Sequence, residues 1–211
     1  DLAQVIKKVN TDKKLIAITL DGMTKTAHMV RILELLEQYK IQVTFFTEGI
    51  LAAEDEQIIT QIREKGFDIE NYTLSAEKHM EKWSEADLIK DFVKTNQVLK
   101  DLTGRRPSLL KCNVTDYTDK VLHSAKVAEL DGVVASDYML SASSFSSYDA
   151  AAGFVSRLTN GSIVSIKLGE ELDAEEYKPI KEQLTPAEDK QASLVLEKSK
   201  EEVVDNKIVQ T

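Results

Sequence analysis

The stretch Ile69–Ala76, IENYTLSA, decides how the rest of the chain is interpreted. Its apolar start is typical of a buried strand, and the polar residues Asn71, Thr73 and Ser75 are typical of a turn. The segment therefore predicts a strand, Phe67–Leu74, that runs into a polar loop. Such a loop is either ordinary connecting sequence or the end of a metal-binding strand whose ligands have been replaced.

The chain around this stretch alternates between strand and helix patterns. Short apolar runs rich in branched residues predict strands, and apolar residues recurring at steps of three and four predict helices. The predicted strands are Lys14–Leu20, Val43–Phe46, Phe67–Leu74, Leu109–Asn113, Gly132–Ala135 and Ser162–Leu168. The predicted helices are Lys25–Tyr39, Glu56–Lys65, Ser84–Gly104, Asp119–Leu130 and Asp149–Leu158.

This alternation predicts an α/β protein with a parallel sheet or barrel covered by helices. Six strands before residue 170 favour barrel-like closure over a small open sheet. In a barrel the working face lies at the carboxyl ends of the strands. The candidate residues at that face are Asp21, Asn71–Ala76, Lys111–Asn113, Asp137 and Lys167.

Composition excludes several classes of function. The 211 residues carry a formal net charge of −9. Residues 170–211 hold 12 acidic and 6 basic side chains, so residues 1–169 carry a net charge of only −3. No basic stripe is present, which argues against nucleic-acid binding, and no apolar run of about 18 residues predicts a membrane span. The single Cys112 excludes an internal disulfide and a thiolate zinc cluster.

Four segments carry a more specific signal, because they occur in order and at strand or helix ends. Thr19–Thr24 reads TLDGMT, Glu70–Ala76 reads ENYTLSA, Thr103–Pro107 reads TGRRP before Leu110–Asn113, LKCN, and Gly161–Lys167 reads GSIVSIK. They resemble the motifs T-F-D-D-G-P, G-N-H-T-x-S-H, T-G-x-x-P with R-P-P-Y, and G-S-I-x-L-x-H. These are the motifs of the polysaccharide deacetylases, the NodB homology domain of carbohydrate esterase family 4, and the resemblance covers Lys14–Leu168.

The resemblance implies a distorted (β/α) barrel of the polysaccharide deacetylase type. We expect residues 1–180 to form the deacetylase-like domain and residues 181–211 to form an acidic, helical C-terminal extension. The family acts on cell-wall and other surface polysaccharides, so the resemblance implies an extracellular or cell-envelope protein of bacterial origin.

The resemblance also implies which residues once carried the chemistry. In the family an aspartate and two histidines hold a divalent metal such as zinc, which activates water and polarises the acetamide carbonyl. Those ligand positions fall here on Gly22, Tyr72 and Ala76, so no metal cofactor is expected. Glycine and alanine offer no donor atom, and a tyrosine phenol is a poor ligand at neutral pH.

Of the catalytic set, the resemblance retains only Asp21, at the position of the general base. The general-acid histidine corresponds to Lys167, and the arginine that orients the base corresponds to Lys111, which cannot form a bidentate fork. A one-residue gap would instead align Asp21 with the aspartate ligand. Asp21 either keeps a substrate contact or caps the following helix.

Other candidates are weaker. Asn71, Tyr72, Lys111 and Lys167 are predicted to contact substrate. Cys112 is expected to be a small core residue rather than a nucleophile.

The three histidines follow no recognised ligand spacing, so surface positions are expected for His28, His79 and His123. Trp83, just before the predicted N-cap Ser84, fits a hydrophobic staple.

The sequence therefore predicts a catalytically inactive deacetylase-like domain that binds carbohydrate or serves as a scaffold. The expected partners are polysaccharide or peptidoglycan, or another protein or domain. The alternative is a divergent hydrolase that removes N-acetyl groups from a polysaccharide by cleaving a carbon–nitrogen bond that is not a peptide bond. Its active site would be rebuilt around Asp21, His79 and Lys167. A third possibility is one part of a larger protein in which a second domain is active.

Overall fold

The computed structural model describes residues 1–141 and 143–169. These residues divide into two compact units. The first comprises Asp1–Lys7, Asp21–Met23 and Thr44–Ala135, and the second comprises Lys8–Leu20, Thr24–Val43 and the chain from Ser136 onward. The predicted C-terminal extension, residues 181–211, lies outside the described residues.

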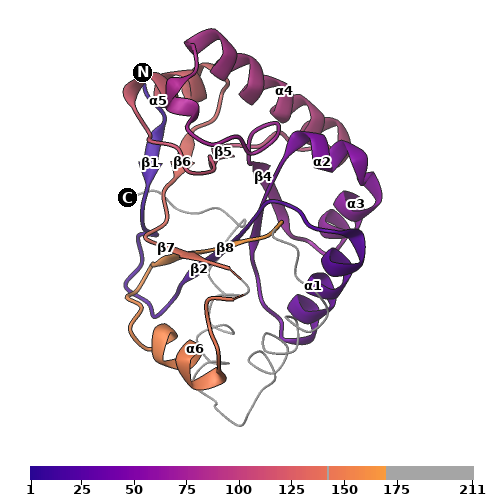
Figure 1. Cartoon of the computed structure of the whole chain (residues 1–211), viewed down its shortest axis with the longest axis vertical. Coiled ribbons are helices and arrows are strands. Elements are labelled where there is room, and N and C mark those ends of the chain that lie inside the picture. Colours follow the sequence, from indigo (N-terminus) through magenta and orange to yellow (C-terminus); the bar gives the residue numbers. More distant parts are fainter. Residues whose placement is uncertain (142, 170–211) are drawn as a thin grey trace. The chain divides into compact units, whose positions relative to one another are not determined.

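The first unit is built on a parallel sheet. Its strands follow the order β1-β6-β5-β4-β3, and β1, β6, β5 and β4 can be followed side by side in Figure 1. The bounds of these strands are β1 (Gln4–Ile6), β3 (Thr44–Thr47), β4 (Asp68–Asn71), β5 (Leu109–Leu110) and β6 (Gly132–Val134). Because all five strands run in one direction, their carboxyl ends share one edge of the sheet.

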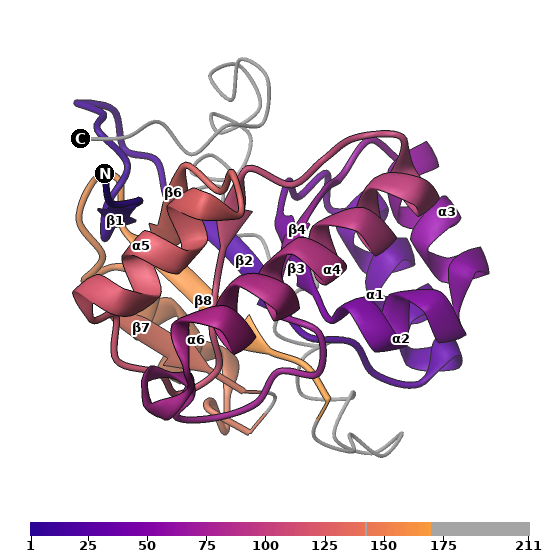
Figure 2. The same ribbon diagram turned by 90° about the horizontal axis from the view of Figure 1, so that it is seen from above.

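Helices cover this sheet. The longest, α4 (Glu85–Thr103), packs against its neighbours α2, α3 and α5, as Figure 2 shows. Those neighbours span α2 (Gly49–Glu54), α3 (Glu56–Glu64) and α5 (Asp119–Val127), and a 3₁₀ turn, η1 (Met80–Lys82), precedes α4.

Side chains and a glycine fix the ends of these helices. The Ser84 hydroxyl accepts a hydrogen bond from the Asp87 amide at the start of α4, as expected for the predicted N-cap. Gly104 ends α4 with φ +76°, a left-handed conformation that glycine adopts without steric cost.

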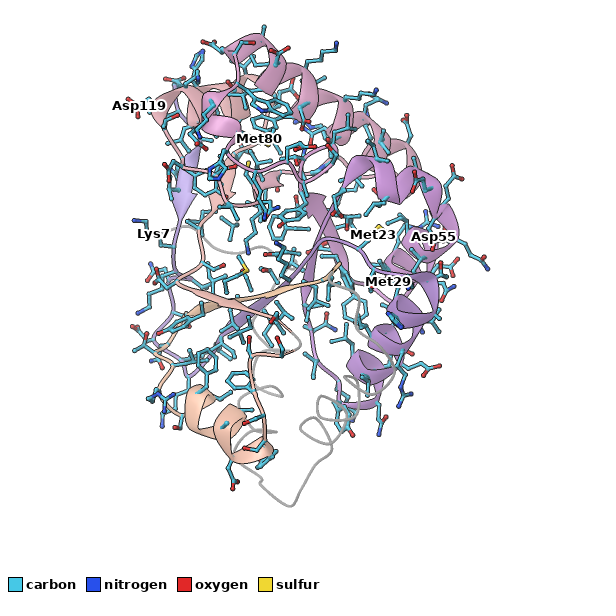
Figure 3. The ribbon with its side chains drawn as sticks, in the orientation of Figure 1. Lys7, Met23, Met29, Asp55, Met80 and Asp119 are labelled. Atoms are coloured by element: carbon cyan, nitrogen blue, oxygen red, sulfur yellow. The ribbon has the colours of Figure 1, made fainter. Side chains whose placement is uncertain are left out.

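The first unit has a continuous apolar core. Met80, labelled in Figure 3, is fully buried together with Leu88 and Phe92 of α4 and Val133 of β6. Trp83 packs against the same cluster, which agrees with the hydrophobic staple predicted for this residue. Leu110 of β5 and the following Cys112 belong to the same cluster, so this packing fixes the carboxyl end of β5.

The second unit contains the remaining elements. These are β2 (Ala17–Asp21), whose last residue belongs to the first unit, α1 (Thr26–Gln38), β7 (Tyr138–Leu140), α6 (Tyr148–Val155) and β8 (Ile163–Lys167). β7 and β8 pair in parallel. The α6 residue Phe154 packs edge-on against Tyr138, with ring centroids 5.4 Å apart.

Most predicted elements are present with boundaries shifted by one to three residues. The strand predicted at Leu109–Asn113 is shorter, because the chain leaves the ladder after Leu110. Four elements were missed. These are β1, β7, α2 and the 3₁₀ turn η1, which are three to six residues long and therefore too short to reveal a period. None of the helices in residues 1–141 and 143–169 is long and apolar enough to cross a membrane.

Candidate functional site

A buried ion pair lies at the carboxyl edge of the first unit. Asp21 ends β2 and is fully buried, and Lys111, directly after β5, is only 3% exposed. The Lys111 Nζ lies 2.6 Å from the Asp21 Oδ2 and 5.8 Å from the centre of the Phe46 ring. Burial lowers the pKa of Lys111 and the Asp21 carboxylate opposes that shift. Asp21 does not cap α1, whose N-cap is Lys25.

The polar residues of the 71–76 loop are used to build the loop itself. The Asn71 Oδ1 accepts from the Thr73 amide at 2.7 Å, and the Asn71 Nδ2 donates to the Asn96 Oδ1 at 2.8 Å and to the Phe92 carbonyl. The Thr73 hydroxyl accepts from the Ala76 amide. Asn71 is fully buried, so in this conformation its side chain holds the turn and does not face a ligand.

Neighbouring elements tie the same loop down. The Asp91 Oδ1, from the buried face of α4, accepts from the Leu74 amide at 3.0 Å. The Asn113 side chain donates to the Ala76 carbonyl at 2.9 Å, and the Lys111 amide donates to the Asn71 carbonyl at 2.9 Å. The segment after β5 therefore contacts both ends of the loop after β4.

Tyr72 and Cys112 are buried beside this ion pair. Burial raises the pKa of the Tyr72 phenol, and the charges of Asp21 and Glu48 raise it further. Burial likewise raises the pKa of the Cys112 thiol, with a smaller effect from Asp91. Cys112 belongs to the apolar core, so it lacks the thiolate character that a nucleophile requires.

The residues at the ligand positions do not fit a divalent metal. Gly22 has no side chain, Ala76 has only a methyl group, and the raised pKa of Tyr72 keeps its phenol protonated at neutral pH. The charge of Asp21 is already balanced by Lys111 at 2.6 Å. Across residues 1–141 and 143–169, no three His, Cys, Asp or Glu side chains gather in a group that could hold a metal ion.

The remaining candidates lie apart from this cluster or in the other unit. His79 is exposed in a left-handed conformation, with its Nδ1 3.5 Å from Glu81, and His123 faces Glu85 on the surface. His28 on α1 and Lys167 at the end of β8 belong to the second unit. The first unit thus brings together Asp21, Asn71, Tyr72 and Lys111 but not His79.

Two acidic residues of this region were not predicted from the sequence. Glu48 follows β3 at the same edge of the sheet, and Asp91 lies on the buried face of α4. Glu48 could have been found because it lies only two residues after the predicted strand Val43–Phe46. Asp91 carried no such signal, since a charged residue on a helix is usually solvent-exposed.

Comparison with known proteins identifies the family. The family model described as polysaccharide deacetylase matches residues 8–133, which is more than half of the chain. The chain therefore belongs to the polysaccharide deacetylase family. A curated relative, the peptidoglycan-N-acetylglucosamine deacetylase of Bacillus cereus, is 32% identical over 68 residues, 32% of this chain and 32% of the relative. The match thus spans about a third of that relative's length.

Solved structures agree on the fold. The crystal structure of a peptidoglycan N-acetylglucosamine deacetylase bound to a hydroxybenzamide compound has a TM-score of 0.72 at 20% identity, covering 87% of this chain and 85% of that one. A mutant of a carbohydrate esterase family 4 pseudoenzyme with restored enzymatic activity has a TM-score of 0.68 at 20% identity, covering 85% and 66%. The predicted distorted (β/α) barrel is confirmed.

Proposed function

We propose that this chain is a polysaccharide deacetylase-like protein without metal-dependent activity, which binds carbohydrate or serves as a scaffold at the cell envelope. The observation that carries the proposal is the Asp21–Lys111 pair, 2.6 Å apart, in a site whose three ligand positions supply no suitable donor. Hydrolysis of an acetamide by this family's chemistry needs a metal-activated water. The lack of a suitable donor at Gly22, Tyr72 and Ala76 supports the proposal that this chain does not bind the ion that would activate the water.

The peptidoglycan deacetylase of Bacillus cereus supports the proposed location and ligand class. Its name specifies an N-acetylglucosamine polymer of the cell wall as the substrate of that protein. We infer that this chain meets the same class of glycan, peptidoglycan or a related N-acetylated polysaccharide, outside the cytoplasm.

The chemistry can be tested with the purified protein. Acetate release is measured from chitin oligomers and from peptidoglycan fragments, with EDTA and with added Zn²⁺ or Co²⁺, and the Bacillus cereus enzyme serves as the positive control. We expect no metal-dependent release above the rate without protein. Release that requires the metal and disappears in an Asp21→Asn variant would instead favour the divergent hydrolase.

Binding is tested separately by retention on insoluble peptidoglycan and chitin. The half-buried Lys167 is the one predicted substrate contact outside the buried cluster around Asp21. We expect Lys167→Ala to weaken retention, whereas Lys94→Ala, a matched change on the exposed face of α4, leaves it unchanged. No retention of the unmodified protein on either glycan would remove the carbohydrate-binding half of the proposal.

A further inference from the structure

Two loops at the carboxyl edge of the first unit are joined by hydrogen bonds. One connects β4 to α4 and the other connects β5 to α5. The His79 amide of the first loop donates to the Val114 carbonyl of the second at 2.9 Å. In the opposite direction, the Asn113 side chain donates to the Ala76 carbonyl at 2.9 Å. The two loops therefore form one double loop, in which His79 and Val114 are direct neighbours.

Left-handed backbone conformations are concentrated in this double loop. It contains four of the six non-glycine residues that have a positive φ in residues 1–141 and 143–169, namely Thr73 (+64°), Ala76 (+52°), His79 (+57°) and Val114 (+40°). A side chain branched at Cβ makes this conformation a genuine outlier. Thr73 is branched too, but its hydroxyl accepts from the Ala76 amide at 3.0 Å. Val114 has no polar group that could compensate in this way.

The Val114 side chain adds no packing to the core. The residue is 56% exposed, whereas Cys112, on the same loop, belongs to the apolar cluster. Glycine or asparagine would hold the left-handed turn with less strain. Neither the backbone nor the core therefore favours valine at position 114. Strained residues that the surrounding contacts hold in place cluster at ligand sites, and contact with a ligand is a use for these exposed methyl groups.

His79 presents an imidazole beside those methyl groups. Its side chain is 56% exposed, and its Nδ1 lies 3.5 Å from the Oε1 of Glu81, whose side chain is only 13% exposed. The Glu81 Oε2 accepts from the Asp116 amide at 3.3 Å, so the second loop holds this carboxylate in place. A carboxylate that faces Nδ1 favours the proton on that nitrogen. The His79 Nε2 is then the nitrogen that can accept a hydrogen bond from a ligand.

We propose that His79 and Val114 form a recognition surface, the acetamido ledge, for the N-acetyl groups of a polysaccharide. The inference rests on the carbohydrate-binding half of the proposed function. The N–H and the methyl group of an acetamido substituent point to the same side of the amide plane. The methyl group packs on Val114, while the N–H donates to the His79 Nε2. The glycan thus contacts exposed loops at the carboxyl edge of the sheet, where ligands bind in such folds, and not the buried residues around Asp21.

The charges of the double loop fit a neutral ligand. Apart from the buried Lys111, the two loops carry three acidic and two basic side chains, which are Glu77, Lys78, Glu81, Lys82 and Asp116. These charges nearly balance, so the acetamido ledge has little electrostatic preference for an anion or a cation. Recognition is then left to the methyl contact and the hydrogen bond. A deacetylated sugar, which has an ammonium group and no methyl group, loses both.

The first test measures the affinity of the full chain for tetra-N-acetylchitotetraose by titration, together with retention on insoluble chitin. Val114→Asn removes both methyl groups but tolerates the left-handed conformation. We expect it to bind about 5-fold more weakly or worse, while the free energy of unfolding stays the same or rises because strain is relieved. His79→Asn should weaken binding to a similar degree. Val114→Ile, which keeps a branched aliphatic side chain, should bind as the unmodified protein does.

Val93→Asn is the matched control, because Val93 is an exposed valine in the regular helix α4. We expect it to leave the affinity unchanged. The second test replaces the probe with fully deacetylated chitotetraose, which should bind at least about 5-fold more weakly than the acetylated form. Circular dichroism shows whether each variant is folded, and Val114→Gly replaces Val114→Asn if the latter unfolds.

The proposal is overturned if Val114→Asn and His79→Asn bind the acetylated tetramer as tightly as the unmodified protein, or if the deacetylated tetramer binds equally well. Either result, with the unmodified protein still retained on chitin, refutes only the acetamido ledge. An unmodified protein that binds neither chitin nor the tetramer refutes the ledge and the carbohydrate-binding half of the proposed function together. Metal-dependent acetate release by the unmodified protein refutes the proposed lack of activity and leaves the affinity comparison as the test of the ledge.

Discussion

Two buried carboxylates of the first unit are neutralised in different ways. Asp21, at the carboxyl edge of the sheet, faces the ammonium of Lys111, which is buried as deeply as Asp21 itself. Glu70, in the middle of β4, faces Arg105, whose side chain is 46% exposed, and also accepts from the Ser108 and Leu109 amides at 2.8 and 2.9 Å.

The contrast separates the two roles that a buried carboxylate can have. Glu70 fixes the loop between α4 and β5 through backbone amides, so its partners are built into the fold and its arginine reaches water. Asp21 is paired with the long, flexible side chain of Lys111. A fully buried pair of that kind is costly to desolvate, so its presence alone is weak evidence for a stabilising role. This difference distinguishes the Asp21–Lys111 pair, in which both charges are buried, from the Glu70–Arg105 pair, in which the guanidinium reaches water.

The largest effect is expected from Lys111→Met. It leaves the Asp21 carboxylate buried without its cation, and we expect a loss of about 3–5 kcal/mol in the free energy of unfolding. Urea denaturation followed by circular dichroism measures it. The matched control, Asp21→Asn with Lys111→Met, removes both charges and should recover most of the loss. A single variant as stable as the double one would mean that the pair contributes nothing to the fold.

A smaller effect is expected from Glu70→Ala. The change leaves the Ser108 and Leu109 amides without their acceptor, and each unsatisfied buried amide costs about 1–3 kcal/mol. We expect a total loss of about 2–4 kcal/mol in the same denaturation experiment. Glu70→Gln keeps an acceptor oxygen and should cost less than half as much. Equal losses for the two variants would show that the charge of Glu70, not its amide contacts, matters most.

Asp91 is a third buried carboxylate for this comparison. Among the described residues, it accepts a hydrogen bond from the Leu74 amide but has no ion-pair partner. Burial raises the pKa of Asp91 to about 6 against its ordinary value of 3.8, the Leu74 amide opposes the shift and Glu77 adds to it. A folded-state pKa above the unfolded one stabilises the protein at low pH. That contribution is complete below about pH 4 and is lost as the pH rises through about 6.

Asp91→Asn removes this titration while keeping an oxygen that can accept from Leu74. We compare the free energy of unfolding of the unmodified protein with that of Asp91→Asn. Between pH 4 and pH 7 we expect the unmodified protein to lose about 2 kcal/mol relative to the variant. Urea denaturation of both proteins at several pH values measures the difference. A difference that stays constant over that range would place the pKa of Asp91 at its ordinary value.

Much of the fold follows from sequence periodicity, but the geometry of the site does not. The spacing of apolar residues predicted α1 and α4 nearly to the residue, because each has a wide buried face. The strand of two residues at Leu109–Leu110 could not be bounded, since pairing with β4 and β6 defines it rather than its own pattern.

The candidate site shows the same limit. The motif resemblance identified Asp21 and Lys111, but their contact at 2.6 Å joins residues 90 positions apart and depends on which strands are neighbours. The backbone conformation of Gly22, which bears on the alignment of the first motif, is a property of the fold. Asn71 was predicted both to shape the turn and to contact substrate, and its hydrogen bonds fit the first role.

The smallest effect is expected at the exposed end of the Glu70 network. Arg105 also lies 3.2 Å from Asp68, but its guanidinium reaches solvent, and exposed ion pairs contribute little because water screens them. We expect Arg105→Met to cost about 1 kcal/mol or less and to leave the Ser108 and Leu109 amides bonded to Glu70. Urea denaturation of both proteins at low and high salt tests this, because the loss in the free energy of unfolding on Arg105→Met should become smaller as the salt concentration rises. If Arg105→Met lowers the free energy of unfolding as much as Lys111→Met does, then the exposure of Arg105 makes no difference to what its ion pair contributes to stability.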